Sequence, residues 1–282
     1  MTTKVPPPAA ARAQRPRTEG AQRLPVPVLV VAVGAVGLLV LPLAGLFPRV
    51  DWPHFFEAIT APEALFALGL SLRTGAIAVV CCLVLGIPLA LVLARARPAV
   101  AAVLRTLVTL PLVLPPLVGG LALLYLFGRQ GWLGAILLPL GVEVPFSPAA
   151  VVLAQTFVAM PFLVLSLEGA LRTAGSKYEE VAATLGAGRW TVLRRVTLPL
   201  VIPGLLAGTV LAFARAVGEF GATAMVAGNM PGRTQTVPMA IYTAFNGAGV
   251  GREAALALAV LLIVVALVIL IGLRDWRRRV VW

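Results

Sequence analysis

The chain has 282 residues, of which 60% are hydrophobic and only 12% are charged, and its mean hydropathy is +0.99. A soluble domain of this length cannot hide so much apolar surface, and several apolar runs reach the ~20 residues that a helix needs to cross a bilayer. The runs do not alternate between polar and apolar residues, as the strands of a membrane β-barrel would. The composition therefore excludes a soluble globular domain and predicts an all-α membrane protein.

The net charge of +12 would suggest nucleic-acid binding in a soluble protein. Here the basic residues lie in short segments beside apolar runs, so the positive-inside rule explains them. The adjacent Cys81 and Cys82 lie inside an apolar run and have neither disulfide nor metal-ligand spacing. His54 is the only histidine and has no partner for a metal site. We therefore expect no metal, no cofactor and no nucleic-acid partner.

Residues 1–24 are rich in Pro, Ala and Arg and predict a disordered basic cytoplasmic tail. A cleaved signal peptide is the alternative. The next apolar run, about 27–47, is longer than the apolar core of a signal peptide and is followed by further spans, which favours a retained first helix. With the mildly acidic outer loop at 48–67 it makes up the region 25–67.

Further apolar runs predict additional transmembrane helices, so that six are expected in all. They lie at about 70–94, 106–127, 148–170, 203–226 and 252–273. Prolines inside the third span predict a kink, which is tolerated where neighbouring helices or a cavity satisfy the freed backbone groups. Outer loops are expected at 128–147 and 227–251, and part of the second, which is rich in Gly, Pro and Asn, could re-enter the membrane.

The distribution of charge predicts the orientation. Most of the 23 Lys and Arg residues fall in the N-terminal tail, at 95–105, at 171–202 and in the basic C-terminal tail at 274–282. The outer loops hold only Arg49, Arg129, Arg233 and Arg252. The positive-inside rule therefore places both termini and the segment 171–202 in the cytoplasm.

Segment 176–199 is a polar interruption between two apolar spans. Ser176 and Glu179 have the spacing of a capping box, so a helix should begin at Lys177, and Gly186 follows where a left-handed C-terminal cap is expected. Apolar side chains recur along one face of this helix: Tyr178, Val181, Ala182 and Leu185.

A second amphipathic piece, about 190–196, should end before Pro199. We therefore expect a helix-turn-helix on which another protein docks. A helix that lies on the membrane surface is the alternative.

This segment resembles the EAA signature of ABC importer permeases, E-A-A-x3-G-x9-I-x-L-P. The positions that match it at their spacing are Glu180, Ala182, Gly186, Leu198 and Pro199, whereas Val181 and Val196 replace its first Ala and its Ile. In that family the element forms coupling helices that fit a groove on the ATPase subunit, and the resemblance implies the same role here. The chain has no G-x-x-x-x-G-K-[ST] phosphate loop, so ATP would be hydrolysed by a separate polypeptide.

A second polar group lies in the fifth span. Arg215 and Glu219 are spaced i and i+4, so they should share one helix face. Counted from Pro203 at ~1.5 Å per residue, Arg215 should lie ~18 Å into the membrane, where charges normally pair and face a bundle interior or an aqueous path. With Thr223 the pair is a candidate gate or pathway lining for an anion; an ion pair that only fixes helix packing is the alternative. Other hydroxyl groups could contribute: Ser71, Thr74 and Thr236.

The block F-A-R-A-V-G-E-F-G-A-T at 213–223 and the run from Pro231 to Tyr242 look like the molybdate and sulfate permease group, the second run more like its molybdate branch. This resemblance covers about 68–273, the expected ABC permease transmembrane domain. It implies a six-helix type I ABC importer transmembrane domain in the cell membrane that carries molybdate.

Sulfate, thiosulfate and tungstate are alternative substrates, and a secondary transporter or channel is the alternative of another class. The partners that the resemblance implies are cytoplasmic ATPase subunits, an extracytoplasmic substrate-binding protein and a second copy of the permease.

Overall fold

The computed structural model describes residues 25–280, apart from the side chains of 269, 270 and 272 onward. Every regular element in this range is a helix, as the composition predicts. The predicted N-terminal tail, residues 1–24, lies outside the described residues, as do the side chains of the predicted C-terminal tail.

The chain divides into two compact units, residues 1–48 and 49–282. The first contains α1 (Val26–Ala44), and the 3-10 turn η1 (Phe47–Arg49) follows at the border. The sequence of α1 is apolar on every side, which is the pattern of a helix surrounded by lipid. The predicted first span is confirmed as a helix.

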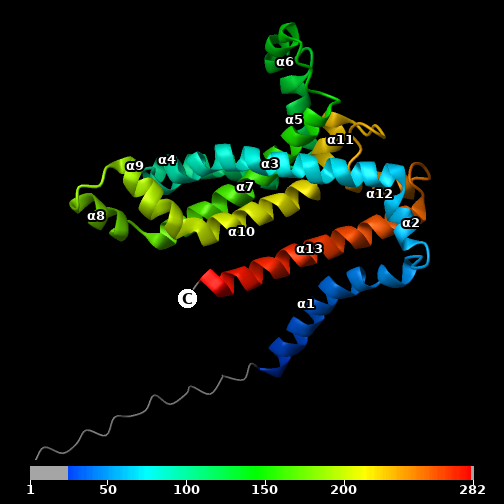
Figure 1. Cartoon of the computed structure of the whole chain (residues 1–282), viewed down its shortest axis with the longest axis horizontal. Coiled ribbons are helices and arrows are strands. Elements are labelled where there is room, and N and C mark those ends of the chain that lie inside the picture. The colour runs from blue at the N-terminus through cyan, green and yellow to red at the C-terminus, as the bar shows by residue number, and fades with distance from the viewer. Residues whose placement is uncertain (1–24, 281–282) are drawn as a thin grey trace, which may run out of the picture. The chain divides into compact units, whose positions relative to one another are not determined.

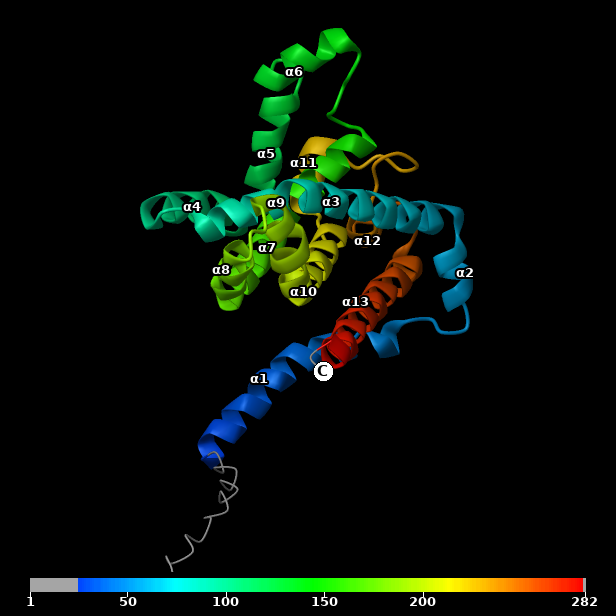
Figure 2. The same ribbon diagram turned by 60° about the vertical axis from the view of Figure 1, so that its left-hand side comes forward.

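The second unit is built on three long helices that pack together, α3 (Pro62–Arg95), α7 (Pro148–Ala174) and α10 (Leu198–Val217). Figures 1 and 2 show them side by side. Their directions follow from close approaches at glycines. A Cβ on Gly204 would lie 2.3 Å from the Cβ of Ala170, and one on Gly208 would lie 2.9 Å from that of Ser166. From Gly204 to Gly208 the residue numbers increase along α10, while those of the contacted residues, Ala170 and then Ser166, decrease along α7. Helix α10 therefore runs antiparallel to α7.

The same reasoning orients α3. A Cβ on Gly75, in the first half of α3, would lie 2.9 Å from the side chain of Val217 at the end of α10. A Cβ on Gly86 would approach Leu163 of α7 equally closely. Helix α3 is therefore antiparallel to α10 and parallel to α7. Small residues at these contacts are typical of helix packing in membranes, where close backbone approach replaces the hydrophobic driving force.

The predicted third span is not a single kinked helix. Helix α4 (Pro98–Val113) ends at Leu114, and α5 (Pro116–Phe127) begins after two extended residues with ψ of 137° and 132°. The cause is the pair Pro115–Pro116, because each proline disfavours a helical conformation for the residue before it. Figures 1 and 2 show that α5 leaves the bundle in a direction different from that of α4.

The predicted boundaries of the fifth span are wrong at both ends. Helix α9 (Arg189–Val192) runs through a π-helical segment, η3 (Leu193–Thr197), directly into α10, so there is no stop before Pro199. The proline lies in the first turn of α10, where its missing N–H is least costly, and the wider π turn precedes it. At the other end α10 stops at Val217, and α11 (Gly221–Ala227) begins after a short non-helical joint.

The segments predicted as outer loops hold short helices that the sequence patterns do not predict. They are α2 (Phe55–Thr60), α6 (Trp132–Leu137), the 3-10 turn η2 (Leu138–Leu140) and α12 (Val237–Phe245). Helix α12 packs on α3 and on the last helix, α13 (Arg252–Val280), around buried Ala67, Val237 and Leu258. The predicted loop at 227–251 therefore contains a packed helix.

Among the described residues, five helical segments are long and apolar enough to cross a membrane. They are Val26–Arg49, Pro62–Arg95, Pro116–Leu140, Pro148–Ala174 and Arg189–Val217. The sixth predicted span, 252–273, falls in α13, whose side chains are described only in part.

Candidate functional site

The predicted coupling helix is present as α8 (Lys177–Thr184) and begins at the predicted residue. It ends in a Schellman motif. Gly186 has φ of +84°, its N–H donates to the Ala183 carbonyl, and the Ala187 N–H donates to the Ala182 carbonyl, at 3.0 and 3.1 Å. Glycine adopts this left-handed conformation without steric cost, which is why the pattern predicts the helix end correctly.

The predicted capping box does not form. Ser176 has helical backbone angles (φ −94°, ψ −9°) instead of the extended ones that a capping residue needs, and its side chain caps no backbone N–H. Its hydroxyl instead donates to Glu180 Oε1 at 2.5 Å. Glu180 therefore supports the start of α8 locally, and Glu179 is free to act elsewhere.

The apolar face of α8 is uncovered. The exposed fractions are 61% for Tyr178, 53% for Val181 and 84% for Leu185, and α8 has no buried residue. Contiguous apolar side chains that the chain itself leaves open indicate an interaction surface. Of the other residues matched to the EAA signature, Ala182 and Leu198 are half-buried and Pro199 is exposed.

Glu179 turns towards the helical bundle. Its Oε1 accepts hydrogen bonds from Arg95 Nη2 at 2.8 Å and from Thr197 Oγ1 at 2.6 Å. Arg95 is the last residue of α3, and Thr197 is the last residue of η3. Sequence reasoning missed this cluster because its members are 84 and 18 residues apart, beyond any helical spacing.

A second carboxylate lies nearby in sequence, within the apolar helix α7. Glu168 is 4% exposed and forms ion pairs with Arg105 of α4 and with Arg172, one turn further along α7. The Arg172 Nε–Glu168 Oε1 distance is 2.8 Å. This cluster fixes α4 to α7. A glutamate inside a predicted span is a signal that could have identified it.

Arg215 and Glu219 do form an ion pair, with 2.6 Å between Arg215 Nη1 and Glu219 Oε2. They do not share a helix face, however, because α10 ends two residues before Glu219. The second oxygen of Glu219 accepts the Ala222 N–H at 2.7 Å, so the carboxylate also satisfies an amide in the first turn of α11. Glu219 is 1% exposed and Arg215 is 28% exposed, so the carboxylate is fully enclosed and the guanidinium is not.

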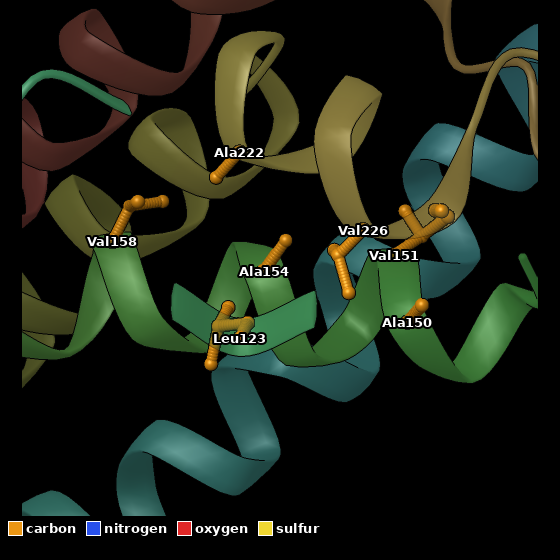
Figure 3. Close-up of a cluster of buried hydrophobic side chains, with 8 residues drawn as sticks. Leu123, Ala150, Val151, Ala154, Val158, Ala222 and Val226 are labelled. Carbon is orange, nitrogen blue, oxygen red and sulfur yellow. The ribbon is translucent and has the colours of Figure 1, made fainter. Parts of the chain in front are cut away.

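Thr223 lies one residue beyond this amide, on α11. In Figure 3, Ala222 and Val226 of α11 lie beside Ala154 of α7, within a cluster of buried apolar side chains. The hydroxyl of Thr223 is buried and has no hydrogen-bond partner among the described residues. The hydroxyl of Thr236 and both polar atoms of the Gln155 amide are likewise buried and have no hydrogen-bond partner among the described residues.

The other candidate hydroxyl groups are occupied. Ser71 Oγ accepts the Val237 N–H at 2.8 Å and so joins α3 to α12. Thr74 donates to the Leu70 carbonyl of its own helix at 2.8 Å, the common behaviour of helical threonine.

The predicted outer side carries polar groups of its own. An open pocket of about 680 Å³ is lined by acidic and basic side chains, among them Asp51, His54, Glu57, Arg252 and Glu253. The hydrogen bond from His54 Nδ1 to Asp51, 2.8 Å long, raises the pKa of the imidazole above its ordinary value. No group of three His, Cys, Asp or Glu residues in the part of the chain that the structure describes could hold a metal ion.

Residues 86–280 match the family described as "Binding-protein-dependent transport system inner membrane component". The chain is 53% identical over 249 residues to the molybdenum transport system permease protein ModB of Mycobacterium tuberculosis, with 88% of this chain and 93% of the relative covered. It is 41% identical over 223 residues to ModB of Escherichia coli K12 (79% and 96% covered) and 32% identical over 245 residues to the sulfate transport system permease protein CysT of the same strain (86% and 88% covered).

Among solved structures, the fold is similar to a chain of a bacterial alginate ABC transporter in complex with alginate pentasaccharide-bound periplasmic protein. The TM-score is 0.67 at 18% identity, and 90% of this chain and 93% of that chain are covered. The all-helical architecture is thus that of an ABC importer transmembrane domain. The chain belongs to the family of binding-protein-dependent transport system inner membrane components, and it is a multi-pass permease of the cell membrane.

Proposed function

We propose that this chain is the permease subunit of an ATP-driven importer that carries molybdate across the cell membrane. The observation that carries the proposal is a comparison within one organism: the chain is more similar to the molybdenum permease of Escherichia coli than to the sulfate permease of the same strain. Sulfate is the second candidate, because the sulfate permease of that strain covers 86% of this chain, against 79% for the molybdenum permease, although at lower identity.

In the proposed assembly, two copies of the chain form the permease, each with six spans and cytoplasmic termini. Cytoplasmic ATPase subunits dock on segment 176–199, through the open apolar face of α8 and the residues matched to the EAA signature. They hydrolyse ATP, since this chain carries no phosphate loop. A substrate-binding protein delivers the anion at the opposite face, where the outer pocket lies. The uncovered apolar side chains of α8 support the ATPase contact.

We further propose that the joint between α10 and α11 lies beside the anion pathway. Glu219 is fully enclosed by its two bonds and has a structural role, whereas Arg215 is partly open and presents positive charge. Thr223 adds a hydroxyl that has no partner within the described chain. Charged groups inside membrane spans normally pair with one another and often mark the pathway of an ion or substrate, which supports this placement.

Complementation tests the choice of substrate. The chain, expressed with its own ATPase and binding-protein partners, should restore growth of a bacterium that lacks its molybdate permease when molybdate is limiting. It should not restore growth of a strain that lacks its sulfate permease when sulfate is the sulfur source. The reverse pattern would replace molybdate by sulfate, and rescue without the ATPase subunits would contradict an ABC importer.

A further inference from the structure

We propose that Glu179 is a positioning residue that ties the coupling helix α8 to the membrane-spanning helices α3 and α10, so that movement imposed on α8 by the ATPase subunits reaches both. This inference rests on the proposed function of α8. It adds a residue that the EAA match does not include.

The geometry of the carboxylate supports this role. One oxygen of Glu179 accepts two hydrogen bonds, from Arg95 at the end of α3 and from Thr197 at the junction of η3 and α10. Thr197 is 3% exposed, so its bond is sheltered from water. Charge-assisted hydrogen bonds of this kind are stronger than neutral ones. A single side chain therefore connects three elements that are separate in the sequence.

Helix α8 needs such a connection because little else holds it. It has eight residues and none of them is buried. Gly175 and Gly186, at its two ends, both have positive φ, so the chain bends sharply on either side of the helix. A docking helix can transmit a displacement to the membrane-spanning helices only through bonds that remain intact while it moves. Glu179 supplies these bonds, while the neighbouring Glu180 bonds to Ser176 within the same segment.

The attachment point is itself distinctive. Thr197 closes the five-residue π-helical segment, and such segments often mark functional positions in longer helices. Arg95 lies at the other attachment point, where α3 ends before the corner to α4. Displacement of Glu179 would therefore act on the inner ends of α3 and α10 together, and these two helices pack on each other.

The test uses the complete transporter, with ATPase subunits and binding protein, reconstituted in liposomes. Glu179→Ala should assemble and hydrolyse ATP, but molybdate uptake per ATP should fall about tenfold, the effect expected when a charge-assisted hydrogen bond is lost. The charge exchange Glu179→Arg with Arg95→Glu should recover much of this ratio. The matched control is Arg97→Ala, which removes the same charge two residues from Arg95 and should leave the ratio unchanged.

Wild-type coupling in Glu179→Ala, or a charge exchange no better than its single variants, would overturn the proposal. If Glu179→Ala fails to assemble, Thr197→Val and Arg95→Met decide the question, because each removes one donor and keeps the carboxylate. Unchanged coupling in both would also overturn the proposal. Failure of the proposed function is seen separately, because the wild-type transporter itself would then show no ATP-dependent molybdate uptake.

Discussion

The joint between α10 and α11 should be sensitive to a single substitution. Glu219→Ala removes the partner of Arg215 and the acceptor of the Ala222 N–H in one step. Glu219 is 1% exposed, so the Ala222 N–H is left with little access to water, whereas Arg215, which is 28% exposed, can be hydrated in part.

The magnitude follows from these two losses. Breaking a buried ion pair by removing one partner costs about 3–5 kcal/mol, and loss of a helix cap costs about 1 kcal/mol. The Arg215 side chain is 28% exposed and can partly rehydrate, so the lower end of the first range applies, and the total is about 4 kcal/mol. At roughly 2–4 °C per kcal/mol for a chain of this size, Tm should fall by about 10 °C.

Thermal unfolding of the purified permease in detergent measures this shift. Glu219→Gln is the matched variant, since it keeps the side-chain size and an acceptor for the Ala222 N–H and loses only the charge; its Tm should lie between those of Glu219→Ala and the wild type. The double variant Arg215→Ala/Glu219→Ala leaves neither charge unpaired. Its loss of stability should therefore be smaller than the sum of the losses in the two single variants. A Glu219→Ala Tm equal to that of the wild type would refute the reasoning.

Three further outcomes can be checked on the same protein. Gly120→Ala should lower Tm, because the added Cβ would lie 2.5 Å from a backbone oxygen of α11. The control Gly69→Ala should not lower it, because a Cβ there meets nothing within 4 Å. Equal Tm values for the two variants would argue against the α5–α11 packing. Gly186→Trp should abolish uptake with insertion intact, because it disrupts the end of α8 where φ is positive, and normal uptake would contradict the docking role. In an NMR titration Asp51→Asn should lower the pKa of His54, because the bond to Asp51 raises it in the wild type. The stability that this bond contributes is fully present below the ordinary imidazole pKa of ~6.5 and is lost as the pH rises through the raised pKa. An unchanged His54 titration in Asp51→Asn would show that the bond is absent.

The sequence predicts the class of fold and several elements well, because these depend on local pattern. A long apolar run bounded by Pro148 and a polar segment identifies α7, and the glycine at position 186 identifies the end of α8. The paired prolines at 115 and 116 predict a kink, whereas in the structure they divide the helix into α4 and α5.

The candidate site is predictable only in part. The spacing of Arg215 and Glu219 predicts their pairing correctly, yet it also predicts a shared helix face that does not exist. The helix ends at Val217, and the Glu219 carboxylate accepts an amide of the next helix, an arrangement that a pairwise spacing rule does not consider. Long-range contacts such as Arg95–Glu179 have no local signature at all.

The central claim is that this permease imports molybdate when ATPase subunits act on its coupling helix. Uptake of radiolabelled molybdate by liposomes that contain the permease, its ATPase subunits and its binding protein tests this claim most directly. We expect uptake that requires both ATP and the binding protein, that resists an excess of sulfate and that disappears in Gly186→Trp. Uptake that proceeds without ATP, or import of sulfate in preference to molybdate, would contradict the account.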